Sequence, residues 1–116
     1  MKFMLLIYGD EQATAHATPE QLQAVGDEYE VFTKSIVDTG QFLDGDPFLP
    51  TGTATTVTVR DGRTETAEGP VVTTDPQLIA YYKVEAEGPD EARELAARVP
   101  GARYGAVEVR QVVVFD

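Results

Sequence analysis

The sequence predicts an α+β fold in which two split βαβ halves share one sheet, within a single domain that spans residues 1–116. Three observations lead to this prediction. Two segments carry apolar residues at helical spacing, β-prone segments lie before, between and after them, and Asp61-Gly62 stands between two β-rich arms, as in a tight hairpin turn. A chain of 116 residues is long enough to bury one core and too short for two ordinary domains.

The first half begins with a strand over residues 2–8 that is apolar on both faces and is therefore expected at the centre of the sheet. A loop over residues 9–17 leads to a helix, which Thr18 caps, Pro19 begins and Gln21 supports as the second member of a capping box. Gly40 closes its last turn. The apolar face of this helix is formed by Leu22, Val25, Tyr29, Phe32 and Ile36.

The second half continues with a short strand within residues 41–50, hairpin arms within 53–67 and a strand over 78–86. A second helix within 88–101 has a stripe of Ala92, Leu95, Ala96 and Val99, and a last strand covers 104–116. Two helices on one face of the sheet leave the other face bare. We expect a homodimer that covers this face, lined either by Phe3, Leu5 and Ile7 or by Met4, Leu6 and Tyr8.

Composition excludes several classes of partner and site. The net charge of −11 repels phosphate backbones and anionic lipids, so we expect neither a nucleic-acid nor a membrane partner. The absence of cysteine excludes disulfides and thiolate catalysis. The apolar run at the N-terminus meets Gly9-Asp10-Glu11 too early for a signal-peptide core, which predicts a cytoplasmic protein.

Several segments together resemble the YCII-related family, in the branch named for its DGPF motif. They are "MKFMLLIYGDE", "TATTVTVRDGRT", "EGP", "QLIAYYKVE" and "ARYGAVEVRQV", in the family's order and over nearly the whole chain. The resemblance implies a ferredoxin-like βαβ-hairpin-βαβ fold with a mainly antiparallel sheet and two helices on one face. It also implies a dimeric, α+β barrel-like assembly with a pocket between sheet, loops and partner subunit. Activity in the family is mostly uncharacterised; some relatives resemble lyases or dehydrochlorinases, and some domains are attached to sigma factors.

The tetrapeptide Glu68-Gly69-Pro70-Val71 stands where the branch has Asp-Gly-Pro-Phe. A carboxylate followed by glycine and proline suits a tight turn, because glycine tolerates unusual dihedral angles and proline fixes its own. The alternative is that Glu68 is an acid that lines a pocket, a candidate catalytic residue. The sequence departs from the branch at Val71, which replaces the aromatic residue, and at Ile79-Ala80, which replace a small pair before the tyrosines.

His16 is the only histidine and the second candidate catalytic residue. A loop imidazole is able to act as a general base near neutral pH, although a single histidine without an orienting carboxylate is more often solvated. In relatives that resemble enzymes, the histidine lies in a Pro-x-His-Leu setting at the start of the first helix. Here that setting is Pro19-Glu20-Gln21-Leu22, and Gln21 cannot transfer a proton at neutral pH.

The candidate ligand-binding residues are Tyr8, Asp10, Tyr82, Arg103 and Tyr104, at expected strand ends or nearby loops. Arg103 is suited either to a bidentate contact with an anionic organic ligand or to an ion pair with one of many carboxylates. The loop acids Asp44, Asp46 and Glu68 lack the spacing of a known metal loop, so we expect no metal and no cofactor.

Two functional classes remain open. One is a non-catalytic, dimeric module that binds a small ligand or has a regulatory role, which the glutamine at position 21 favours. The other is a cofactor-independent lyase or isomerase that uses His16 or a loop carboxylate on a ligand held by Arg103 and the tyrosines. A histidine–carboxylate contact inside a closed pocket would distinguish the enzyme from the binding module.

Overall fold

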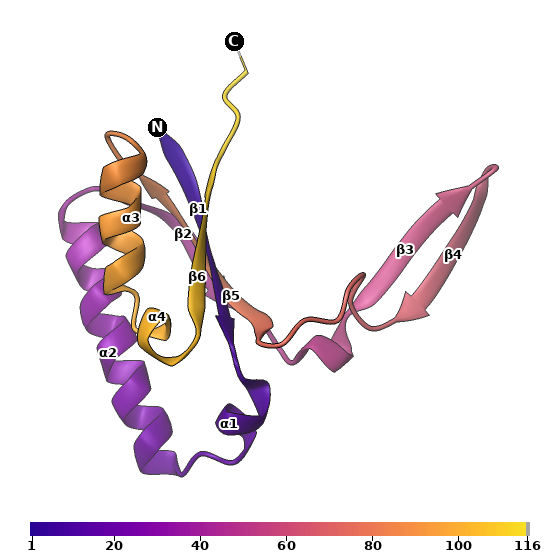
Figure 1. The fold of residues 1–116 in the computed structure, drawn as a ribbon, viewed down its shortest axis with the longest axis horizontal. Coiled ribbons are helices and arrows are strands. Elements are labelled where there is room, and N and C mark those ends of the chain that lie inside the picture. The colour runs from indigo at the N-terminus through magenta and orange to yellow at the C-terminus, as the bar shows by residue number, and fades with distance from the viewer. Residues whose placement is uncertain (116) are drawn as a thin grey trace.

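The computed structural model describes residues 1–115. Figure 1 shows a four-stranded sheet with helices on one side and a hairpin that projects on the other. The elements, in chain order, are β1 (Lys2–Gly9), α1 (Glu11–Ala15), α2 (Pro19–Asp38), β2 (Phe42–Pro47), the 3-10 turn η1 (Thr51–Thr53), β3 (Thr55–Arg60), β4 (Arg63–Glu68), β5 (Gln77–Glu85), α3 (Pro89–Arg98), α4 (Gly101–Tyr104) and β6 (Ala106–Gln111).

The main sheet has the strand order β2-β5-β1-β6, and all neighbouring strands are antiparallel. The chain passes from β1 through α2 to β2, and from β5 through α3 to β6, which gives the predicted pair of split βαβ halves. The α+β, ferredoxin-like fold is therefore confirmed, and β1 lies between two neighbours as expected.

The core lies between the sheet and the two longer helices. From β1 it receives Phe3, Leu5 and Ile7, which alternate along one face of the strand and are at most 2% exposed. The helix α3 contributes Ala92, Leu95 and Ala96, and Val99, which caps its C-terminus, completes the predicted stripe. The apolar residues that alternate along the strand thus pack against those that recur at helical spacing, as an α+β fold requires.

The helix α2 begins and ends where the sequence predicts. Thr18 accepts from the Gln21 N–H, the Gln21 side chain accepts from the Thr18 N–H, and Gly40 follows the helix with φ of +75°. Its predicted face is only half buried, because Phe32 and Ile36 enter the core while Leu22 is 47% exposed. The first turns of α2 extend past the sheet (Figure 1). Within residues 1–115, no helix is long and apolar enough to cross a membrane.

The hairpin β3–β4 turns at Asp61-Gly62, where both residues have positive φ, as the predicted tight turn requires. At its base Gly69 has φ of +102°, its N–H donates to the Ala54 carbonyl, and its carbonyl accepts from the Thr56 hydroxyl. The Glu68-Gly69-Pro70 break therefore ends β4 and returns the chain to the sheet. This is the turn role predicted for the glycine.

Three sequence-based boundaries were wrong. The segment expected to be a loop contains α1, because the Asp10 carboxylate accepts from the Gln12 N–H and caps a short helix. The chain after α3 forms one more helical turn, α4, which places Tyr104 in a helix and not in the last strand. The strand β6 covers only Ala106–Gln111, and Asp116 lies outside the described residues.

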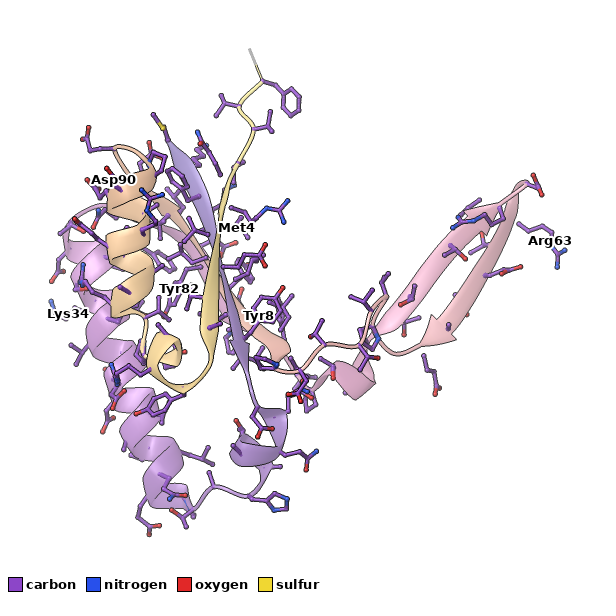
Figure 2. All side chains as sticks on the ribbon, viewed as in Figure 1. Met4, Tyr8, Lys34, Arg63, Tyr82 and Asp90 are labelled. Atoms are coloured by element: carbon purple, nitrogen blue, oxygen red, sulfur yellow. The ribbon has the colours of Figure 1, made fainter. Side chains whose placement is uncertain are left out.

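The face of the sheet away from the helices is open. Figure 2 shows Met4 and Tyr8 on this side and Tyr82 on the helix side. Strand alternation places half-buried Met4, Leu6, Tyr8 and Tyr81 on the open face. The edge strands carry charges there, so the face is mixed and not uniformly apolar as the sequence suggested; these charged residues are Asp44, Asp46, Glu108 and Arg110.

Candidate functional site

A groove of about 540 Å³ lies between α1, the overhanging first half of α2, the end of β1, and α4. We call it the α1 groove. Its walls carry mostly apolar and phenolic side chains, and they include Tyr8, Asp10, Gln21, Val25, Tyr29 and Tyr104. This volume falls within the range of pockets that bind small organic molecules.

Hydrogen bonds through Glu11 hold α1 in place over this groove. The Glu11 carboxylate accepts from the Thr51 N–H at 2.8 Å and from the Thr51 hydroxyl at 3.0 Å. The Glu11 N–H donates to the Gln77 side-chain oxygen at 3.0 Å. One acid thus links the first helix to the segments before and after the hairpin. The wall of the groove is therefore set by contacts between residues far apart in sequence.

The inner end of the groove is closed by Tyr29 of α2 and Gly101 of α4. Gly101 is buried, and a Cβ there would lie 2.6 Å from the Tyr29 hydroxyl oxygen and 2.8 Å from the Ile7 side chain. Burial raises the pKa of the Tyr29 phenol, and a hydrogen bond from the Gly101 backbone opposes this rise. Tyr29 is thus a protonated, packed residue at neutral pH.

An ion pair lies beside the groove. Arg103 on α4 pairs with Glu28 on α2, and its guanidinium lies 5.4 Å from the centre of the Tyr104 ring. The arginine side chain is 57% exposed and the glutamate side chain 39%. Of the two alternatives for Arg103, the structure contains the ion pair.

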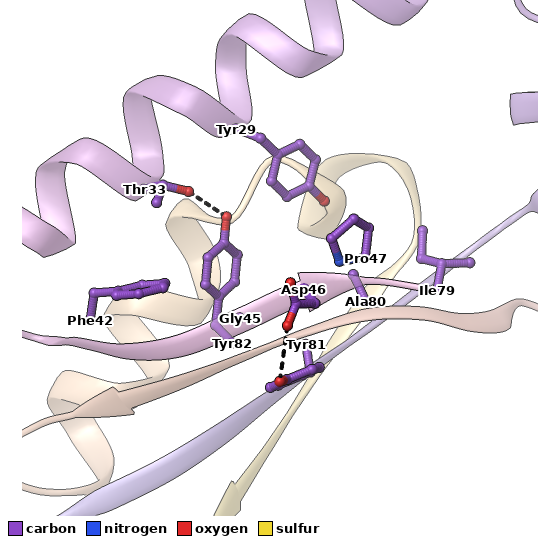
Figure 3. Close-up of a pocket in the computed structure, with 10 residues that line it drawn as sticks. All are labelled: Tyr29, Thr33, Phe42, Gly45, Asp46, Pro47, Ile79, Ala80, Tyr81 and Tyr82. Carbon is purple, nitrogen blue, oxygen red and sulfur yellow. Dashed lines mark hydrogen bonds between the residues drawn. The ribbon is translucent and has the colours of Figure 1, made fainter. Parts of the chain in front are cut away.

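A second pocket of about 420 Å³ lies between α2 and the strands β2 and β5. Figure 3 shows Tyr29 and Thr33 facing this pocket from α2, with Tyr82 rising from the strand toward Thr33. The two hydroxyls are 2.6 Å apart, and Tyr82 is 8% exposed. Burial raises the pKa of the Tyr82 phenol, while the Thr33 hydrogen bond acts in the opposite direction.

The tyrosine next in sequence, Tyr81, lies on the other side of β5. Its hydroxyl donates to the Asp44 carboxylate at 3.0 Å and to the Asp46 carboxylate at 3.4 Å. The hydrogen bond to Asp44 is the largest cause of a raised pKa for the Tyr81 phenol, and the hydrogen bond to Asp46 acts in the same direction. Among residues 1–115, no three or more His, Cys, Asp or Glu side chains gather as metal ligands would.

The structure brings together three of the residues predicted to bind a ligand. Tyr8, Asp10 and Tyr104 line the α1 groove, and Arg103 is adjacent to it through Glu28. Tyr82 is separate from these, because it belongs to the core and to the second pocket. Its prediction as a residue at a strand end was wrong, since it lies within β5 and pairs with Leu5.

The two candidate catalytic residues lie apart from the groove. His16 is exposed at the C-terminal cap of α1, and it is absent from the residues that line the groove. Glu68 is exposed where β4 ends, at the base of the hairpin. In the part of the chain that the structure describes, the side chains of His16 and Glu68 form no hydrogen bond with each other.

Sequence reasoning missed the residues that shape the groove most. Helical spacing assigned Tyr29 and Val25 only to the apolar face of α2. Tyr29 does pack against the core, but both residues also line the groove because α2 extends past the sheet. Gly101 was interpreted as the end of a helix, whereas it begins α4 and leaves room for Tyr29. The Pro100-Gly101 pair is a local signal for a turn, but it does not reveal which side chain the glycine accommodates.

Among the described residues, apolar, phenolic, amide and carboxyl side chains line the groove. None of the described residues that line it is a histidine, lysine or arginine. Gln21, at the position of the histidine in relatives, has its side-chain oxygen engaged by the Thr18 N–H at 2.9 Å. Asp10 caps α1, and Glu28 pairs with Arg103. The acids of the groove thus hold the structure together.

The antiparallel sheet, the helices on one of its faces and a ligand-sized groove beside the first long helix define a small ferredoxin-like α+β protein. The model of the YCII-related domain matches residues 1–116, so the chain belongs to the YCII-related family. The chain is also similar to an uncharacterized protein of Rhizobium meliloti (strain 1021), with 26% identity over 117 residues that cover 99% of this chain and 94% of that protein.

Proposed function

We propose that this protein is a non-catalytic module that binds a small, neutral organic ligand in the α1 groove and works as a homodimer. The observation that carries the proposal is the lining of the groove. It combines apolar side chains such as Val25 with the phenols of Tyr29 and Tyr104, and none of the described residues that line it is basic. Such a surface gains affinity from apolar contact and orients a ligand through few polar groups.

The positions of Gln21 and His16 favour binding over acid–base catalysis. A general base needs hydrogen-bond reach to the reacting proton and usually a third group that orients it. Gln21 lines the groove but is an amide that completes the capping box of α2. His16 is exposed and does not line the groove.

Electrostatics favour a neutral ligand over the anionic one that Arg103 suggested. Arg103 is already paired with Glu28, and Glu28 and Asp10 both line the groove. A ligand carboxylate would therefore meet two acids and would have to compete for the arginine. In a chain with a net charge of −11, the surrounding field adds to this repulsion.

The open face of the sheet supports the homodimer. Met4, Leu6, Tyr8 and Tyr81 occupy its central strands, and the charged side chains Asp44, Asp46, Glu108 and Arg110 occupy the two edge strands. An apolar centre with a charged rim is the usual anatomy of a protein interface. Packing two such faces removes the partly exposed apolar side chains from water.

A binding experiment with a matched pair of probes tests the ligand proposal. We expect indole, a neutral probe, to shift the backbone amide NMR signals of Gly9, Val25 and Tyr104, and indole-3-acetate to bind more weakly because of its carboxylate. Val25→Trp fills the groove and is expected to abolish the indole shifts. Val31→Trp is the control on the same helix, since Val31 is 72% exposed.

Two results contradict the proposal. The first is that indole at millimolar concentration does not shift the NMR signals of the groove residues, or shifts them equally in Val25→Trp. The other is tighter binding of indole-3-acetate together with its loss in Arg103→Gln, which would assign the groove to anions. Loss of binding in His16→Ala would favour the lyase or isomerase class, because the exposed histidine has no role in the binding proposal.

A further inference from the structure

We propose that the second pocket is a further binding site, which takes a small neutral aromatic molecule and holds one oxygen of it with the hydroxyl pair of Thr33 and Tyr82. The proposal goes beyond the function proposed for the α1 groove, and it depends neither on a ligand in that groove nor on a dimer. The pocket lies within one chain, between α2 and the strands β2 and β5 (Figure 3). Its volume of about 420 Å³ is near the lower end of the range for ligand sites, which suits a molecule with one ring.

Aromatic and small residues give the pocket its shape. The rings of Tyr29, Phe42 and Tyr82 line it, together with Ala80 on β5. Phe42 and Tyr82 meet edge to face, with ring centres 6.3 Å apart and an angle of 78° between the planes. Gly45 leaves the space for the tyrosine ring, since a Cβ there would lie 2.8 Å from it. The wall is therefore fixed before a ligand binds, and such preorganisation favours affinity.

The polar side-chain groups that face the pocket are hydroxyls. The Thr33 and Tyr82 oxygens are 2.6 Å apart, and either hydroxyl is able to be the donor. Because burial raises the pKa of the Tyr82 phenol, both groups keep their protons at neutral pH. Their mutual hydrogen bond uses one of these two protons, and neither hydroxyl forms a further hydrogen bond with a described residue. The second proton is therefore available to a hydroxyl or carbonyl oxygen of a ligand.

Charge favours a neutral ligand in this pocket. None of the described residues that line it is basic, and the one acid among them is Asp46. The Asp46 carboxylate accepts from the Tyr81 hydroxyl at 3.4 Å, on the face of β5 opposite to Tyr82 (Figure 3). A charged ligand would thus face no side chain of opposite charge, and burial of an unpaired charge is costly. A neutral ring with one oxygen matches both the aromatic walls and the hydroxyl pair.

Both strands that line the pocket carry a β-bulge. The pairing of β2 with β5 shifts register between Phe42 and Asp44, and the pairing of β1 with β5 passes over Ile79. Bulges change the direction of side chains and are frequent beside active sites. Ile79 and Tyr29 line both the pocket and the α1 groove, so the two sites are neighbours that share a wall.

A matched pair of probes tests the site. 4-Methylphenol carries a hydroxyl oxygen, and toluene has the same ring and methyl group without it. We expect 4-methylphenol at millimolar concentration to shift the backbone amide NMR signals of Phe42, Gly45 and Ala80, which line the second pocket and do not line the α1 groove. Toluene should shift the same signals through apolar contact alone.

Two double variants of the full chain isolate the contribution of the hydroxyl pair. Thr33→Val/Tyr82→Phe removes both hydroxyls at nearly constant volume and leaves neither of them unpaired. We expect it to weaken the binding of 4-methylphenol about fivefold or more, and to change the binding of toluene by less than about twofold. Thr14→Val/Tyr104→Phe is the matched control, since it removes the same two groups from the lining of the α1 groove. It should leave the shifts in the second pocket as they are in the parent.

Each of three results would overturn the second site. The first is that neither probe shifts the signals of Phe42, Gly45 and Ala80 in the parent. The second is that Thr33→Val/Tyr82→Phe weakens both probes equally, because a role in packing alone would act on toluene as well. The third is that the control variant loses these shifts while Thr33→Val/Tyr82→Phe keeps them, which would assign the probe to the α1 groove. Indole reports on the groove through other amides, so either site is able to fail without the other.

Discussion

Gly69 adopts φ of +102°, and a Cβ built there would meet no atom within 4 Å. Glycine is therefore needed here for its backbone conformation and not for lack of space around the side chain. We expect Gly69→Ala to lower the free energy of unfolding by about 1 kcal/mol or more, because alanine is strained at positive φ. Glu68→Gln is the control, expected within about 0.5 kcal/mol of the parent because its side chain is exposed. Urea midpoints decide this, and equal midpoints for the two variants would contradict the turn role of the glycine.

Tyr29 predicts how stability depends on alkaline pH. Its phenol pKa is raised above the ordinary value of about 10 because burial disfavours the phenolate. The protonated form is preferred in the folded chain, so this stabilisation is complete below pH of about 10 and is lost as the pH rises through the folded pKa. We expect the melting temperature to fall above that pH, and to fall less steeply in Tyr29→Phe.

Tyr104→Phe is the matched control for this pH series, because the Tyr104 ring belongs to the same groove and is 62% exposed. It should retain the parent's alkaline loss of stability. Tyr82 is buried as well and its raised pKa contributes in the same direction. A melting temperature in Tyr29→Phe with the same pH slope as the parent would show that Tyr29 is not protected from solvent.

At the scale of elements, the attachment of α1 depends on Glu11. Its carboxylate accepts two hydrogen bonds from Thr51 and is partly buried. We expect Glu11→Ala to destabilise the protein by about 1.5 kcal/mol, since hydrogen bonds to a charged group are worth more than neutral ones. Hydrogen exchange over residues 9–17 should rise together with the loss in urea midpoint.

Glu30→Ala, an exposed acid on α2, is the control for this substitution. If both variants have the same midpoint and the same exchange over residues 9–17, the Glu11 contacts do not hold α1. In that case the wall of the α1 groove depends on the Asp10 cap alone.

At the scale of the whole molecule, the open sheet face predicts the assembly. We expect static light scattering at micromolar concentration to give the mass of a dimer. Leu6→Glu places an unpaired charge at the centre of the proposed interface and should give a monomer. Val31→Glu, on the exposed side of α2, is the control and should remain dimeric. A monomer mass for the parent would remove the dimer proposal.

Much of the fold was predictable because its signals are local. The Thr18–Gln21 capping box, the Asp61-Gly62 turn and the apolar stripe of α3 each depend on residues within a few positions, and all three appear as predicted. The boundaries that failed depend on weaker local signals. The helix α1 has only five residues, too few for a periodic pattern, and α4 begins at the glycine of a Pro-Gly pair, which usually marks the end of a helix.

The candidate site was predictable in part. Tyr8, Asp10 and Tyr104 meet at the groove because the ends of β1 and α4 lie beside each other. Tyr81 and Tyr82 show what the pattern alone leaves open, since adjacent strand residues point to opposite faces. The helices pack on the face of the sheet that carries Tyr82, so Tyr82 lies in the core against Thr33. Tyr81 lies on the opposite face, where it contacts Asp44.

By itself, the sequence determined the types of the main elements, their order, the tight hairpin turn and the acidic surface. It could do so because periodicity, capping, turn chemistry and charge are properties of neighbouring residues or of composition. Only the tertiary structure decided that α2 extends past the sheet and turns Val25 and Tyr29 into groove walls, that Glu11 joins α1 to Thr51, and that Arg103 is paired with Glu28. These contacts join residues up to 75 positions apart, and such pairings depend on how the elements pack in space.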